Sequence, residues 1–264
     1  MRLILAAALS CALFSPLPAH AKVRTKVVRY AGGGAKLVGY IAYDDSSKKR
    51  RPGVLVVHEW WGHNPYVRRR ARMLAKLGYV ALALDMYGGG KNTSHPKQAG
   101  AFAKQALADF GKARARFEAA MALLQKHPRV DKKRIAAIGY CFGGGVALNM
   151  ARLGIALRAV VSFHGSLKSA LVAQRGKVKA RLLVLHGAAD PFVPPAQVAA
   201  FKAEMKKAGA SLRFVAYKGT RHAFTNPGAD AIGKKHKLAA IRYDKKADVA
   251  SWSEMKRFFK KVLR

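Results

Sequence analysis

Short apolar segments alternate with helical patterns along most of this chain, and that alternation limits the folds it can adopt. Several segments are apolar at every position, which is typical of parallel strands that helices cover on both faces. The order strand, helix, strand, helix therefore predicts an α/β fold with an open, mostly parallel sheet. The predicted strands of this sheet are Val54–His58, Val80–Leu84, Ile135–Gly139, Ala159–Phe163, Leu182–His186 and Leu212–Tyr217.

The residues before these strands predict a hairpin. Thr25–Tyr30 and Lys36–Tyr43 are joined across the glycines at 32–34, which would give the sheet an antiparallel start. No repeat, low-complexity tract or linker divides the sequence after residue 21, so we expect one domain over residues 22–264. The helical patterns, which we expect on both faces of the sheet, cover 66–77, 97–126, 142–153, 195–208 and a stretch within 245–263.

Residues 1–21 have the pattern of a secretory signal peptide. Arg2 precedes an apolar run over 3–14, and Ala19-His20-Ala21 is a small-x-small cleavage site. The run is too short to span a bilayer. We therefore expect cleavage after Ala21 and export to the periplasm or the medium, with a lipid anchor on Cys11 as the alternative.

The chain carries 50 Lys and Arg residues against 13 Asp and Glu, a formal net charge of +37. A disordered polycation is excluded because 51% of the residues are hydrophobic. The excess favours an anionic partner, such as nucleic acid, a membrane surface or an acidic substrate. Basic residues lie on nearly every predicted helix, without a basic stripe, recognition helix or RNA-binding signature. We therefore expect non-specific association with anionic surfaces and no specific nucleic-acid partner.

Three motifs that suggest a metal or a nucleotide lack the necessary spacing. In His58–His63 the second histidine follows the first by five residues, whereas the zinc-protease helix needs four. Gly88–Lys91 is followed by Asn92 rather than the Ser or Thr of a phosphate loop. Gly143–Gly145 has Leu148 where a dinucleotide fingerprint has its third glycine. We expect neither a metal nor a cofactor.

The segment Gly139-Tyr140-Cys141-Phe142-Gly143 joins an apolar strand to a helical stretch. This is the context of a G-x-nucleophile-x-G elbow, with cysteine in place of serine. Glycines on either side let strand and helix approach each other, and the helix dipole favours a thiolate at Cys141. Cys141 would be the only cysteine left after signal removal; its alternative interpretation is a small buried apolar residue.

The acid and the base of such a site are expected after the nucleophile in the chain. Asp190 follows the strand that ends at His186, and His222 follows the strand that ends at Tyr217. Because parallel strands bring their carboxyl ends to one edge of the sheet, Cys141, Asp190 and His222 should meet there. Asp85 also follows a strand, but it precedes Cys141 in the chain.

Six motifs together resemble the dienelactone hydrolase family of α/β-hydrolases, from about residue 25 to the C-terminus. They are Val54–Trp61 with Gly62, Asp85-Met86-Tyr87-Gly88, Gly139–Gly144, Ser162-Phe163-His164-Gly165, His186-Gly187-x-x-Asp190-Pro191 and His222-x-Phe224. The resemblance implies a Cys141–His222–Asp190 triad and a Glu59 that holds or accepts the Cys141 proton. It also implies an oxyanion hole formed by the N–H groups of Phe142 and Trp60. We expect Trp60, Trp61, Tyr87, Phe224 and Asn226 around the substrate.

Two positions depart from this family. Its members bind the substrate carboxylate through two arginines, where this chain has Gly89 and Asn226; Lys91 or Arg221 could substitute. We expect a cysteine-dependent hydrolase of lactone or ester bonds that forms a thioester acyl-enzyme, acts on a small molecule and is monomeric. The alternatives are a broad envelope carboxylesterase or thioesterase, and a polyanion-binding protein with a vestigial site. For Glu59 alone, the alternative is an ion pair at a strand end.

Overall fold

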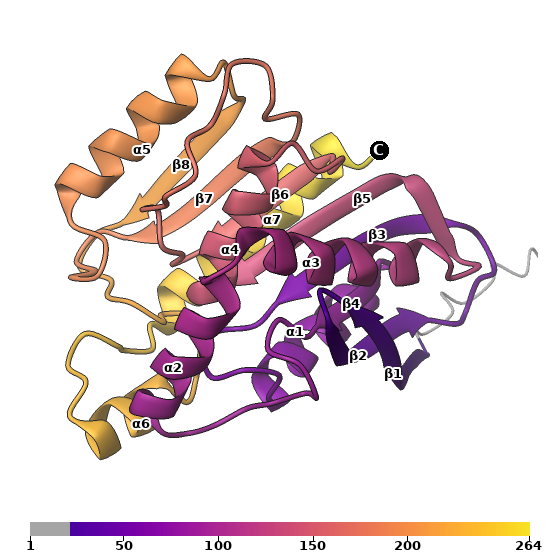
Figure 1. The fold of residues 1–264 in the computed structure, drawn as a ribbon, viewed down its shortest axis with the longest axis horizontal. Coiled ribbons are helices and arrows are strands. Elements are labelled where there is room, and N and C mark those ends of the chain that lie inside the picture. Colours follow the sequence, from indigo (N-terminus) through magenta and orange to yellow (C-terminus); the bar gives the residue numbers. More distant parts are fainter. Residues whose placement is uncertain (1–21) are drawn as a thin grey trace, which may run out of the picture.

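The computed structural model describes residues 22–264, so the predicted signal peptide and Cys11 lie outside the described residues. Eight strands form one sheet in the order β1-β2-β4-β3-β5-β6-β7-β8 (Figure 1). The strands are β1 Val23–Gly32, β2 Ala35–Asp44, β3 Arg51–Val57, β4 Val80–Leu84, β5 Val130–Tyr140, β6 Ala159–Phe163, β7 Arg181–Gly187 and β8 Leu212–Tyr217.

The sheet is parallel from β4 to β8 and antiparallel at its start. β1 and β2 form a hairpin, and β2 pairs antiparallel with β4. All remaining neighbours pair in parallel. Strands β3, β4, β6 and β7 are buried at nearly every position, because helices cover both of their faces. The predicted architecture of a mostly parallel sheet with an antiparallel hairpin is confirmed.

Two apolar clusters occupy the two faces of the sheet. Helices α3, α4 and α5 contribute Phe117, Val146 and Phe201 to one cluster, and α1 and α7 contribute Leu74 and Phe259 to the other (Figure 1). Within residues 22–264, no helix has both the length and the apolar character needed to cross a membrane. The helices are α1 Pro65–Lys76, α2 Pro96–Leu107, α3 Phe110–Gln125, α4 Phe142–Arg152, α5 Pro195–Lys207, α6 Ala229–His236 and α7 Lys245–Val262.

Two helices differ from the prediction. The single helix expected over 97–126 is two helices, because Asp109 interrupts it and caps α3 by accepting a hydrogen bond from the Lys112 N–H at 3.0 Å. Helix α6 was not predicted; it has only eight residues, of which Gly233, Lys234 and Lys235 carry no apolar periodicity.

The acidic side chains hold backbone and basic groups in place. Asp85 accepts hydrogen bonds from the backbone N–H groups of Val38, Tyr87, Gly88 and Gly90, which fixes the triple-glycine loop around a carboxylate of the protein itself. All 13 acidic residues accept at least one hydrogen bond: Asp44, Asp45, Glu59, Asp85, Asp109, Glu118, Asp131, Asp190, Glu204, Asp230, Asp244, Asp248 and Glu254.

Candidate active site

Cys141 occupies a sharp turn between the end of β5 and the start of α4. Its backbone has φ 53° and ψ −119°, a conformation that a residue with a side chain rarely adopts. A Cβ atom on Gly139 would overlap the carbonyl of Gly143, and one on Gly143 would overlap the carbonyls of Val57 and His58. The two glycines therefore permit the close approach of strand and helix on which the elbow depends.

Asp190 and His222 lie together at the same edge of the sheet as Cys141. Asp190 sits in the turn after β7, where its Oδ2 is 2.7 Å from His222 Nδ1. The other oxygen of this carboxylate accepts a hydrogen bond from the Phe192 N–H at 2.9 Å. Cys141 and His222 line one cavity, so the structure brings the three predicted triad residues together.

The charge state of His222 depends on its two partners. Burial alone would lower the pKa of this imidazole. The negative charge of Cys141 and the hydrogen bonds with Asp190 and Cys141 outweigh burial and raise the pKa of His222 to about 10. The imidazolium form of His222 is therefore favoured at neutral pH.

Glu59 lies two residues beyond β3 and is only 2% exposed. Burial raises the pKa of its carboxyl group to about 7, although the Asn226 hydrogen bond and the charges of His222 and Arg70 lower it. Its Oε2 accepts a hydrogen bond from Asn226 Nδ2 at 2.7 Å. The direct partner is thus an amide rather than the cation that the alternative interpretation required, and this carboxyl group can exchange a proton near neutral pH.

The cavity beside Cys141 has a volume of about 290 Å³. Among the described residues that line it, there is no Lys, Arg, Asp or Glu. The lining residues are Trp60, Ala103, Cys141, Phe142, Ser166, Phe192, Val193, His222 and Ile241. Apart from His222 and Cys141, the cavity is therefore mainly apolar and without charge.

Four residues expected around the substrate lie behind this wall. Trp61 packs against Trp60, with ring centroids 4.8 Å apart, and Tyr87 donates a hydrogen bond to the Trp60 carbonyl at 3.0 Å. Phe224 is fully buried, and the side chain of Asn226 binds Glu59. The expectation that these four residues line the pocket therefore differs from the structure. Trp61 and Tyr87 support lining residues, whereas Phe224 and Asn226 contact residues outside the wall.

Sequence reasoning missed five residues of the wall. Phe192 and Val193 lie two and three residues after Asp190, so their closeness to the predicted acid of the triad was an available signal. Ala103 lies on α2, while Ser166 and Ile241 lie on distant loops. No motif marks these three, because only the folded chain brings them to the cavity.

The backbone N–H groups of Phe142 and Trp60 are suited to hold a developing negative charge. Phe142 is the first residue of α4, and Trp60 lies in the turn after β3. Both residues line the cavity that holds Cys141. Within residues 22–264, neither N–H group has a hydrogen-bond acceptor outside regular helix pairing. The family resemblance implies an oxyanion hole at these two groups, and that assignment stays a prediction.

The proposed substitutes for the family's arginines do not reach the cavity. Arg221 is exposed and donates a hydrogen bond to the Ala239 carbonyl at 2.7 Å, while the Lys91 ammonium lies 5.8 Å from the centroid of the Phe102 ring. Within the described part of the chain, no group of three or more His, Cys, Asp or Glu residues could hold a metal ion.

Comparison with known proteins agrees with this geometry. Residues 37–263 match the model of the Dienelactone hydrolase family. A solved structure named m3DLH is 36% identical, with a TM-score of 0.86 over 92% of this chain and 99% of that one. A dienelactone hydrolase-like promiscuous phosphotriesterase from metagenomic libraries is 31% identical, with a TM-score of 0.83 over the same shares of the two chains.

A relative from Methylorubrum extorquens, named "Putative carboxymethylenebutenolidase", is 30% identical over 66% of this chain and 63% of its own. Together these matches identify an ester or lactone hydrolase with the α/β-hydrolase fold. The chain belongs to the dienelactone hydrolase family.

Proposed function

We propose that this protein hydrolyses neutral lactones and carboxylic esters, with Cys141 as the nucleophile and a thioester as the intermediate. The observation that carries the proposal is the position of Cys141. It lies on a strained elbow, at the N-terminus of α4, in one cavity with a His222 that Asp190 holds at 2.7 Å. A thiolate beside an oriented imidazolium is the pattern of an activated cysteine nucleophile.

In the first half-reaction the Cys141 sulfur attacks the carbonyl carbon. The N–H groups of Phe142 and Trp60 hold the resulting oxyanion, and each such donor contributes roughly 3 kcal/mol in comparable sites. The intermediate collapses, the carbon–oxygen bond of the ester breaks, and His222 gives its proton to the departing alkoxide. In a lactone this alcohol stays attached to the acyl group, which is now a thioester of Cys141.

In the second half-reaction water attacks the thioester while His222 takes one of its protons. The carbon–sulfur bond breaks, the carboxylic acid leaves, and the thiolate–imidazolium pair is restored. Asp190 keeps the imidazole in the orientation that both steps need. We assign Glu59 the role of a second proton carrier beside this pair, since a carboxyl group with a pKa of about 7 can hold or release a proton near neutral pH.

The substrate class follows from the uncharged wall. A carboxylate-bearing dienelactone would need a lysine or arginine to bind its carboxylate, and neither lines the cavity among the described residues. The protonated His222 is already paired with Asp190. At the two positions of the family's arginines, Gly89 has no side chain and Asn226 binds Glu59. The same neutral cavity favours a second activity, the hydrolysis of neutral phosphotriesters, because a relative of 31% identity is named for it.

A turnover panel tests the proposal. It contains a neutral lactone, an aryl ester, a thioester, a neutral phosphotriester and a carboxylate-bearing dienelactone. We expect turnover of the neutral compounds by the wild type and none by Cys141→Ala, with an unchanged thermal melt. Ser166→Ala is the matched control, since Ser166 is the other small nucleophilic residue on the cavity wall and its loss should leave turnover intact.

Mass spectrometry identifies the intermediate. Acid quenching during turnover of an aryl ester should trap an acyl adduct on the peptide that contains Cys141. Turnover that survives in Cys141→Ala, or an adduct on Ser166, would contradict the proposed nucleophile.

We also propose that the protein is exported and that residues 1–21 are removed. The support is the signal-like pattern that ends at Ala21. The mass of the protein isolated from its cellular compartment should equal that of residues 22–264. A lipid on Cys11 would instead add the mass of the acyl chains, and an intact N-terminus would contradict both interpretations.

A further inference from the structure

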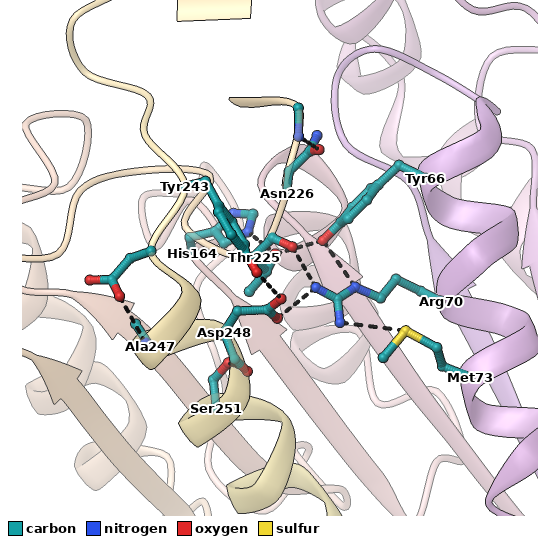
Figure 2. A network of polar contacts seen from close by, with 12 residues as sticks. Tyr66, Arg70, Met73, His164, Thr225, Asn226, Tyr243, Ala247, Asp248 and Ser251 are labelled. Atoms are coloured by element: carbon teal, nitrogen blue, oxygen red, sulfur yellow. Dashed lines mark hydrogen bonds and ion pairs between the residues drawn. The ribbon is translucent and has the colours of Figure 1, made fainter. Parts of the chain in front are cut away.

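A buried histidine outside the triad contacts both the nucleophile and the loop of the catalytic base. Figure 2 shows this histidine, His164, beside Thr225 of that loop. His164 directly follows β6 and is fully buried. Its Nδ1 accepts a hydrogen bond from the Cys141 N–H at 3.1 Å, and its Nε2 lies 2.7 Å from Thr225 Oγ1. Thr225 stands three residues after His222, on the same loop. One imidazole ring thus connects the elbow to that loop.

The hydrogen bonds fix which nitrogen of His164 carries the proton. The Cys141 N–H is shared between His164 Nδ1 at 3.1 Å and the Phe163 carbonyl at 3.0 Å. With Nδ1 as an acceptor, the proton of the neutral ring is assigned to Nε2, which then donates to Thr225 Oγ1. Burial and the positive charges of His222 and Arg70 hold the pKa of His164 well below its usual value. In a protonated His164, the Nδ1–H would point at the Cys141 N–H. The ring would also be a second cation beside His222, since the centroids of the two rings are 5.2 Å apart. His164 therefore stays neutral while His222 is charged.

Helix α1 holds Thr225 from the other side. Thr225 Oγ1 lies 2.6 Å from the Tyr66 hydroxyl, to which Arg70 Nε donates at 3.3 Å. Arg70 also donates to the Thr225 carbonyl and pairs with Asp248 of α7 at 2.6 Å. Figure 2 shows these side chains converging on Thr225 from α1 and α7. The loop of the catalytic base is thus fixed to two helices of one face of the sheet.

The connection lies where the backbone is most strained. Only four non-glycine residues within 22–264 have a positive φ, and three of them belong to this connection: Cys141 at 53°, His164 at 40° and Ala223 at 58°. Such conformations persist when surrounding contacts over-determine them, and they gather at functional sites. Without the hydrogen bonds through His164 and Thr225, the elbow and the His222 loop would be free to relax apart.

We propose that the His164–Thr225 hydrogen bond positions His222 against Cys141, which makes both residues positioning residues of the active site. Neither touches the reacting atoms, since neither lines the cavity. The inference rests on the proposed function, because it has a kinetic meaning only if Cys141 is the nucleophile. The hydroxyl of Thr225 is the group to remove, because a valine at this position breaks the connection and keeps the shape of the threonine side chain.

The test compares Thr225→Val with Thr225→Ser. Valine keeps the shape of threonine and loses the hydroxyl, whereas serine keeps the hydroxyl. A misplacement of about 1 Å can reduce a rate by about 100-fold. We expect Thr225→Val to lower kcat by roughly 10- to 100-fold, with KM within about twofold, and Thr225→Ser to remain within about threefold of the wild type.

The pH dependence of iodoacetamide labelling separates positioning from mere stability. A less well placed imidazolium stabilises the Cys141 thiolate less, so the labelling profile of Thr225→Val should move to higher pH, while that of Thr225→Ser should not. Rates are expressed per folded protein from a thermal melt. If Thr225→Val does not fold, Tyr66→Phe removes the other contact of the Thr225 hydroxyl and should show the same shift to a smaller extent.

Wild-type kcat and a wild-type labelling profile in Thr225→Val, or in Tyr66→Phe if it replaces that variant, would overturn the inference. So would equal losses in Thr225→Val and Thr225→Ser. The fate of the proposed function is read separately: turnover retained by Cys141→Ala refutes the nucleophile, whereas an inactive Cys141→Ala beside a fully active Thr225→Val refutes only the positioning role.

Discussion

Replacing Glu59 by glutamine should make the folded protein more stable above pH 7 and leave it unchanged below pH 4.5. The carboxyl group is 2% exposed, and burial raises its pKa from an ordinary 4.5 to about 7 in the folded state. Between these two values the unfolded chain has released the proton and the folded chain still holds it. The free energy of unfolding of the wild type therefore falls as the pH rises through this window.

The magnitude follows from the size of the pKa difference. One pKa unit corresponds to 1.36 kcal/mol, so a rise from 4.5 to about 7 removes about 3 kcal/mol from the wild type by pH 8. Glutamine has nearly the same shape, can accept the 2.7 Å hydrogen bond from Asn226 and does not ionise. For a chain of this size, about 3 kcal/mol corresponds to a difference in Tm of roughly 6–12 °C.

Urea unfolding of the wild type and Glu59→Gln, measured in parallel from pH 4 to pH 9, provides the assay. The difference in the free energy of unfolding should be constant in acid, rise between pH 4.5 and 7, and level off above. Asn226→Ala is an informative background for the same comparison, because it removes the hydrogen bond that lowers the folded-state pKa of Glu59. In this background the rise should still begin near pH 4.5 but continue to higher pH. A difference that is flat across the whole range would refute the buried, ionising Glu59.

Three other features of the site can be tested with single changes. Asp190→Asn should lower kcat by roughly 10³- to 10⁴-fold in steady-state assays, as in serine triads that lose the aspartate. The reason is that asparagine at the 2.7 Å contact to His222 Nδ1 orients the wrong tautomer of the imidazole. A loss under tenfold would contradict this role. Iodoacetamide should label Cys141 faster than free cysteine at about pH 6, and His222→Asn should abolish that advantage; equal rates in both proteins would indicate an inert thiol. Gly143→Ala should destabilise the protein by roughly 1–3 kcal/mol in urea, since its Cβ would overlap the carbonyls of Val57 and His58; an unchanged unfolding midpoint would show that the elbow can relax.

The strands were predictable because their burial on both faces leaves a strong apolar signal. β4, β6 and β8 have the bounds expected from the sequence, and β1, β2, β5 and β7 extend the expected runs by a few residues. β3 begins three residues before the expected run and ends one residue short of its end, at Val57. The break at Asp109 was missed because the helical periodicity continues across this residue. What separates α2 from α3 is a local hydrogen bond, in which the Asp109 side chain caps the start of α3. α6 was missed because tertiary contacts, rather than its own pattern, hold it.

The parts of the site that follow a fixed order along the chain were predictable from the sequence. The parts that only the folded chain brings together were not. The order of nucleophile, acid and base located Cys141, Asp190 and His222, which share one edge of the sheet. The pocket wall depends on contacts between α2 and distant loops, so aromatic residues near the motifs were assigned to it instead. His164 belonged to a motif already noted, but its contacts to both the elbow and the His222 loop required the folded chain.

The acidic residues bear on how the charge of this protein could be engineered. Since every one of the 13 carboxyl groups accepts a hydrogen bond, replacing any of them by an apolar residue removes an existing contact. The net charge of +37 thus reflects a small number of acidic residues, all of them in use, as well as a large number of basic ones. A designer who wishes to reduce the net charge should therefore add acids at exposed lysine positions outside pairs such as Lys112–Asp109, rather than look for changes among the existing acids.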